Sequence, residues 1–238
     1  MSRGLDPDHV AQIETKFGNF LYLPLDLPSI TAEGIRQYFI ERSKPICKLQ
    51  YDVAGAPHKT QIFNSIDFTF KKSIPRGGIW ETNFEPELLR ELPELIPFLE
   101  ALPFYELPDF MLWSSNMQVQ PHRDSAPWLD CPSSIRSFLL DENPTQTLKL
   151  QEAPSNDQYY FPSFLPLAKS GHFAWNNLRA KHSSTYSRTE QYKKILLIVS
   201  SIMPFDLVKL ENLLDRSVAK YRENALCSVL EQSDFVDG

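Results

Sequence analysis

The run KILLIVSSIM at 194–203 is apolar at consecutive positions, so both of its faces require cover. A strand of this kind lies inside a sheet, because a strand with one face in water alternates apolar and polar residues. Other short strand patterns precede it at 110–119, 135–140, 147–150 and 171–176, and 159–164 fits either a strand or a loop. The region 110–205 is therefore predicted to form a β core.

The N-terminal half mixes helices and strands. Ser29 offers an N-cap for a short helix, and Pro93 and Pro97 must break or kink a later one. In chain order we expect an irregular lead-in at 1–16, a strand at 17–27, a helix from Ser29 to about Arg42, a strand at 61–71 and a helix at 85–102. These elements are predicted to brace the β core.

The last predicted element is an amphipathic helix at 207–231. Its apolar side chains recur at helical spacing, at Leu207, Leu210, Leu213, Leu214, Val218 and Tyr221. Such a face either braces the sheet or forms a dimer contact, and the oligomeric state stays open. We expect one domain over 1–238, with bracing elements at 1–108, the core at 109–205 and the terminal helix at 206–238.

Composition narrows the class of protein. A chain of 238 residues can bury a sizeable core, and its net charge of −6 excludes the basic footprint of a nonspecific nucleic-acid binder. No apolar run reaches the roughly 20 residues of a membrane span, and the N-terminus lacks the apolar core of a signal peptide. The three cysteines form no CxxC pair. We expect a soluble, cytoplasmic protein with neither a nucleic-acid nor a membrane partner.

One short motif carries chemistry. His122 and Asp124 are two residues apart, so on an extended segment their side chains point to the same side. With His182 they complete two imidazoles and one carboxylate, the ligand set of the facial triad that leaves open positions on Fe(II). The sequence predicts that His122, Asp124 and His182 form an iron site. The plainer interpretation is a loop ion pair and an unrelated strand-end histidine.

The order of motifs along the chain extends this prediction. QPHRD at 120–124, IRSFLL at 135–140, SGHFAWNN at 170–177, KHSS at 181–184 and KILLIVSSIMP at 194–204 resemble the 2-oxoglutarate/Fe(II) oxygenases. The resemblance is strongest to the aspartyl/asparaginyl β-hydroxylase and proline hydroxylase-like branch, and it leaves the N-terminal half unmatched. It implies a mainly β fold with flanking helices, a double-stranded β-helix (a jelly-roll or cupin-like barrel). Fe(II) would sit at the barrel mouth on His122, Asp124 and His182, with 2-oxoglutarate and O₂ as co-substrates.

The resemblance also implies a basic residue that binds the distal carboxylate of 2-oxoglutarate. Lys194 occupies that place at the head of the strand after His182. It departs from the family pattern, because lysine replaces the bidentate arginine fork and the gap from His182 is longer. Lys193 and Arg188 remain alternatives. Arg136, at the head of the strand after the HxD loop, would be a second contact.

The implied reaction is hydroxylation of a C–H bond in an amino acid, free or within a peptide, with succinate and CO₂ as co-products. Asp124 favours hydroxylation over halogenation, because halogenating relatives leave that ligand position to chloride. Trp128 and Arg123, near the expected mouth, are candidate contacts for a small-molecule or peptide substrate. His172 is interpreted as a hydrogen-bonded core imidazole rather than a fourth ligand.

Two other classes of function stay open. One is a catalytically inactive, cupin-like binding module. The other is a metal-dependent hydrolase or isomerase that uses the same ligands on Zn²⁺ or Mn²⁺ and needs no anchor at Lys194. A nucleophilic hydrolase is disfavoured because the sequence has no G-x-S-x-G elbow, and no Walker-type run follows Gly77-Gly78.

Overall fold

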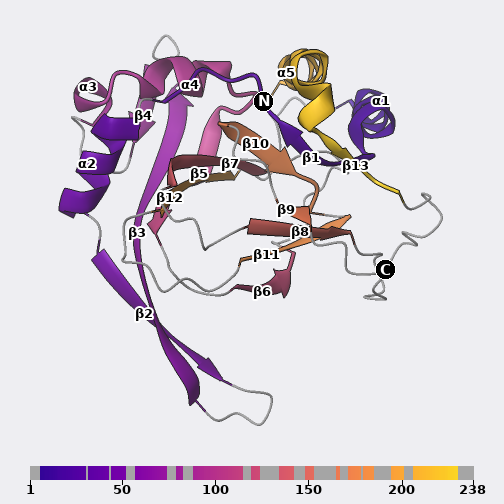
Figure 1. The fold of residues 1–238 in the computed structure, drawn as a ribbon. Coiled ribbons are helices and arrows are strands. Elements are labelled where there is room, and N and C mark those ends of the chain that lie inside the picture. Colours follow the sequence, from indigo (N-terminus) through magenta and orange to yellow (C-terminus); the bar gives the residue numbers. More distant parts are fainter. Residues whose placement is uncertain are drawn as a thin grey trace.

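The structure is a computed structural model. It describes residues 6–30, 32–42, 44–51, 57–73, 79–82, 88–114, 119–123, 134–141, 148–152, 165–166, 171–177, 179–184, 194–200 and 206–229. Its elements are α1 (Pro7–Phe17), β1 (Phe20–Pro24), α2 (Ala32–Arg42), β2 (Lys44–Tyr51), β3 (Pro57–Ser73), β4 (Ile79–Thr82), α3 (Leu88–Glu91), α4 (Leu95–Ala101), β5 (Glu106–Ser114), β6 (Val119–His122), β7 (Ser134–Asp141), β8 (Leu148–Glu152), β9 (Leu165–Pro166), β10 (His172–Trp175), β11 (Ala180–Ser184), β12 (Lys194–Ser200), α5 (Leu207–Tyr221), a 3₁₀ turn (Arg222–Asn224) and β13 (Leu226–Cys227) (Figure 1).

Within the described residues the strands form two antiparallel sheets. The larger has nine strands in the order β13-β1-β10-β7-β12-β5-β3-β2, with β4 paired to β3, and the smaller has the order β6-β11-β8-β9. Figure 1 shows the smaller sheet on one side of the larger and the helices on the other. Two sheets with flanking helices confirm the expected mainly β class, and β12 lies between β5 and β7 as its apolar faces predicted.

Strand alternation places one core on each face of the larger sheet. Tyr22, Phe173 and Trp175 belong to a cluster that also contains Leu150 and Ala180 of the smaller sheet. We call this the inner cluster. Their neighbours along β1 and β10, residues Leu23 and Ala174, belong instead to the cluster formed with α1, α3, α4 and α5.

The eight strands from β5 to β12 pair as a nested set. β8 pairs with β9, β7 with β10, β6 with β11 and β5 with β12. The pairs alternate between the two sheets, so this region is one long hairpin wound back and forth between them. Pairing of β12 with β7 joins the two strand pairs of the larger sheet, and pairing of β11 with β8 joins the two strand pairs of the smaller sheet.

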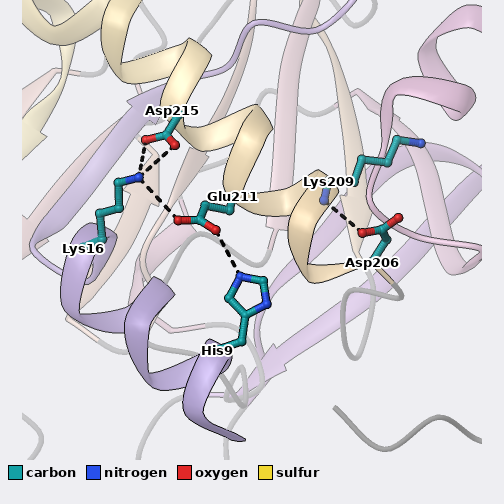
Figure 2. Close-up of polar contacts among 6 residues, drawn as sticks. All are labelled: His9, Lys16, Asp206, Lys209, Glu211 and Asp215. Carbon is teal, nitrogen blue, oxygen red and sulfur yellow. Dashed lines mark hydrogen bonds and ion pairs between the residues drawn. The ribbon is translucent and has the colours of Figure 1, made fainter. Parts of the chain in front are cut away.

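The irregular lead-in expected at 1–16 is wrong, because the helix α1 (Pro7–Phe17) occupies most of these residues. Asp6 caps the helix by accepting a hydrogen bond from the Asp8 backbone N–H at 3.1 Å, and Pro7 stands at the first helical position. Ile13 and Phe17 are buried against the helix layer. On the outside, Lys16 reaches Asp215 of α5 at 2.6 Å (Figure 2).

Two helix boundaries also differ from the prediction. The interruption at Pro93 is confirmed between α3 and α4, but α4 continues through Pro97, because the first turn of a helix does not need the N–H that proline lacks. The terminal helix ends at Tyr221 rather than near 231, and Leu226–Cys227 pairs with β1 instead. The strand or loop expected at 159–164 lies outside the described residues.

The terminal helix α5 packs within the chain. Leu207, Leu210 and Leu214 are buried in the helix-side cluster with Leu23 of β1. The apolar stripe read from the sequence therefore braces the larger sheet. In the described part of the chain, no helix combines the length and the apolar character that crossing a membrane requires.

Candidate metal centre

The two histidines predicted as metal ligands lie opposite each other on neighbouring strands. His122 is the last residue of β6, and His182 is in the middle of β11. The antiparallel register pairs them directly, and their ring centroids are 4.2 Å apart with the ring planes inclined at 50°. His182 is 8% exposed, whereas His122 is exposed at the edge strand of the smaller sheet. The pair thus has one buried member and one that solvent reaches.

This separation suits a shared metal ion. With metal–nitrogen bonds of about 2.1 Å, two imidazoles at right angles on one ion have ring centroids roughly 4.5 Å apart. The measured 4.2 Å is close to that value. Asp124, the third predicted ligand, lies outside the described residues, and among the residues that are described no group of three His, Cys, Asp or Glu side chains gathers around one point. The two imidazoles fit the metal that the sequence predicts.

Trp175, at the end of β10, contacts the buried histidine. Its ring centroid is 4.4 Å from that of His182, with the planes inclined at 33°. The indole is 1% exposed, and its Nε1–H donates a hydrogen bond to Asn177 Oδ1 at 2.6 Å. Trp175 is not among the functional residues that the sequence predicts. The alternation of β10 puts it on the face opposite His172, but only the packing of the two sheets shows that it meets His182.

A buried carboxylate lies on β8, two positions along the strand from the register partner of His182. Leu150 of β8 is the register partner of His182, and Glu152, two residues on, is the partner of Ala180. Glu152 is 7% exposed and accepts hydrogen bonds from Ser228 Oγ and, at 3.1 Å, from the Val229 backbone N–H. No local feature of the sequence signals this contact, because its partners are far apart along the chain.

The two basic residues expected at the co-substrate site lie at different points of one strand pair. Lys194 opens β12 opposite Asp141, whereas Arg136 of β7 is opposite Ile198. Four residue steps along β12 separate these positions, or about 13 Å along an extended strand. The register therefore does not bring the backbones of Lys194 and Arg136 together.

The remaining candidates are placed as follows. Arg123 directly follows β6 and is half-buried, next to His122. Lys193, Arg188 and Trp128 lie outside the described residues.

His172 is confirmed as a structural histidine. Its Nε2 donates to the Pro28 carbonyl at 2.8 Å, and its ring lies 4.8 Å from that of Phe98 in α4. It therefore faces the helix layer, away from His182. Burial holds its pKa below the usual value of 6.5, although the hydrogen bond to Pro28 acts in the opposite direction.

No family model matches this sequence, and no curated protein does. Some solved structures have a similar course of the chain. An oxidoreductase of the 2OG-Fe(II) oxygenase family from Burkholderia pseudomallei aligns over 83% of this chain and 91% of its own, at 13% identity and a TM-score of 0.42. A prolyl hydroxylase from Trichoplax adhaerens, in complex with a hypoxia inducible factor peptide fragment, aligns over 80% of this chain and 86% of its own. The identity is 11% and the TM-score is 0.40.

A prolyl-4-hydroxylase from Pseudomonas putida aligns over 80% of this chain and 98% of its own, at 11% identity and a TM-score of 0.38. At these identities and TM-scores, any assignment of chemistry rests on the residues of this chain. The relevant ones are the two histidines and the strands that pair them.

Proposed function

We propose that this chain is an Fe(II)/2-oxoglutarate-dependent dioxygenase that hydroxylates a C–H bond of an amino acid, free or peptide-linked. One observation carries the proposal: His122 and His182, sixty positions apart in the sequence, are direct cross-strand partners with ring centroids 4.2 Å apart. The nested pairing of β5 to β12 supports the finer fold assignment, a double-stranded β-helix. The whole chain would form one domain around it.

His122, His182 and Asp124 would hold the metal. Bound Fe(II) would supply the oxidation of the C–H bond, coupled to decarboxylation of 2-oxoglutarate to succinate and CO₂. The chain supplies the surroundings. The inner cluster, with Trp175 at 1% exposure, shields His182 from water on the side of the larger sheet. Exposed His122 lies on the edge strand, where substrate and O₂ can approach.

Lys194 would bind the distal carboxylate of 2-oxoglutarate as a point charge. Arg136 would contact a different group, because the register sets it about 13 Å along the strand from Lys194. Arg123, half-buried beside His122, supplies a cation near the entrance. A guanidinium there suits the carboxylate of an amino-acid substrate or an acidic side chain of a peptide.

The test is an anaerobic titration of the metal-free protein with Fe(II) and then 2-oxoglutarate, following the visible charge-transfer band of the chelate. Wild type should show the band, and His122→Ala and His182→Ala should lose it. His172→Gln is the matched control and should keep it, because His172 faces the helix layer.

The absence of a band from folded wild-type protein would contradict the proposal. Tight binding of Zn²⁺ or Mn²⁺ without a band would then favour the metal-dependent hydrolase or isomerase. A folded protein that binds no metal would favour the binding module.

A further inference from the structure

We propose that Trp175, fixed by Asn177, is the positioning residue that sets the orientation of the His182 imidazole for metal binding. This inference rests on the proposed function, because it concerns a ligand of the same metal. It assigns a role to a tryptophan and an asparagine that the motif of metal ligands does not include. The metal is held by side chains, and these two residues act through one of them.

The contact geometry supports this role. The indole lies against the imidazole at 4.4 Å between centroids, which is a closer approach than the 5.9 Å between the rings of Trp175 and Phe173. The indole cannot turn without breaking its 2.6 Å hydrogen bond to Asn177 Oδ1, and both residues are at most 2% exposed. The surface presented to His182 is therefore fixed in place.

The turn between β10 and β11 connects the two residues mechanically. Asn176 donates through Nδ2 to the Gly18 carbonyl at 3.1 Å, and its own carbonyl accepts from the Ala180 N–H at 3.0 Å. Trp175 thus ends one strand and His182 is the central residue of the next, with a hydrogen-bonded turn between the two strands. The hydrogen bonds of Asn176 to Gly18 and to Ala180 therefore limit movement of the indole relative to the imidazole.

An imidazole needs this kind of support. The terminal torsion of a histidine side chain has broad energy wells, whereas a metal requires one ring nitrogen to point at it closely. Residues that orient a metal-binding histidine are commonly hydrogen-bond partners, and losing one typically weakens metal binding by about 10- to 100-fold. Here a buried aromatic face restricts the torsion, with Asn177 holding that face.

The simpler interpretation is that Trp175 only fills the core. If Trp175 only fills the core, weakening the core at another residue should lower metal affinity as much as replacing Trp175. If Trp175 positions His182, it should not. Phe173→Leu removes aromatic volume from the inner cluster two residues earlier on the same strand. It serves as the control for loss of core stability, and it should leave metal affinity near the wild-type value, because Asn177 still holds the indole that contacts His182.

The experiment measures Co(II) binding to full-length protein by calorimetry and by the visible d–d absorption, which reports ligand geometry. Trp175→Leu and Asn177→Ala should bind Co(II) about tenfold or more weakly than wild type, with an altered d–d spectrum. Asn177→Asp keeps an acceptor oxygen for the indole N–H and should restore the affinity. Quenching of tryptophan fluorescence by Co(II) should be reduced in Trp175→Leu.

Wild-type affinity and spectrum in both Trp175→Leu and Asn177→Ala, while His122→Ala abolishes binding, would overturn the positioning role and leave the metal site standing. Failure of wild type to bind Co(II) at all would overturn both. Normal Co(II) binding without the Fe(II)–2-oxoglutarate band would count against the oxygenase alone. Weakened binding in the two variants would in that case still support Trp175 as a positioning residue.

Discussion

Ser228 donates a hydrogen bond to the carboxylate of Glu152, and this contact joins the C-terminal segment to the smaller sheet. The preceding residues, Leu226–Cys227, already pair with β1 at the edge of the larger sheet. The segment therefore fastens the two sheets to each other. Because Glu152 is 7% exposed, its carboxyl group needs hydrogen-bond donors within the protein, and Ser228 and Val229 supply two of them.

Replacing Ser228 with alanine should destabilise the protein. Loss of a hydrogen bond to a buried charged group costs about 1.5–3 kcal/mol in free energy of unfolding, which urea denaturation measures. Val229→Ala is the matched control, because that side chain is 86% exposed and its backbone N–H remains. Equal stability of Ser228→Ala and the control would show that the contact contributes nothing.

The stability of the protein should fall as the pH drops through the range of the His172 titration. Burial lowers the pKa of His172 below its usual 6.5, so between the two values the unfolded chain binds a proton that the folded one does not. His172 therefore opposes folding increasingly as the pH falls below about 6.5. The free energy of unfolding of wild type should decline more steeply from pH 8 to pH 5 than that of His172→Gln. Parallel curves would contradict the prediction.

The docking of α1 on α5 should depend on apolar burial more than on its ion pairs. Ile13 is fully buried, and its truncation to alanine should cost about 2–5 kcal/mol. Lys16 is 46% exposed, so Lys16→Ala should shift the urea midpoint much less, although Asp215 and Glu211 raise the pKa of its ammonium. The Lys16 effect should vanish at about 1 M salt, where screening acts over a few ångströms. A larger loss of stability in Lys16→Ala than in Ile13→Ala would contradict the prediction.

Lys194→Ala should weaken 2-oxoglutarate binding far more than Arg136→Ala. Loss of a charge-assisted contact is worth about 1.5–3 kcal/mol, or roughly 10- to 100-fold in dissociation constant. Arg136 lies opposite Ile198, at a distance along β12 from Lys194, so its removal should have a small effect. Titration of the Fe(II) protein with 2-oxoglutarate measures both constants, and Lys194→Arg should restore the affinity. Unchanged binding in Lys194→Ala would move the anchor to Lys193 or Arg188.

Elements with strong local signals were predictable. The apolar run at 194–200 predicts the interior strand β12, and the leucine spacing from Leu207 predicts the buried face of α5. The start of α1 at Asp6–Pro7 also has a local signal, an N-cap residue followed by proline. β2 was missed because Lys44, Pro45 and Lys48 obscure its alternation, and it is defined by pairing with β3.

The site was predictable only in part, for a physical reason. Histidine and carboxylate spacing indicated which side chains can bind a metal, and the register then brought His122 and His182 together. The contact of Trp175 with His182 depends on how the two sheets pack, and that of Glu152 with Ser228 depends on where the C-terminal segment lies. Nothing in their local sequence encodes either contact. Asp124 lies outside the described residues, so its part in the site remains a prediction.

The winding of β5 to β12 has a consequence for the order in which the molecule assembles. Chain entropy makes closure of a short loop less costly than closure of a long one, so the innermost pair, β8 and β9, has the advantage in folding. Zippering outward from there aligns β7 with β10 next and brings His122 to His182 third, before β5 meets β12. By this order the chain would acquire its metal-binding pair only after the two inner strand pairs have formed.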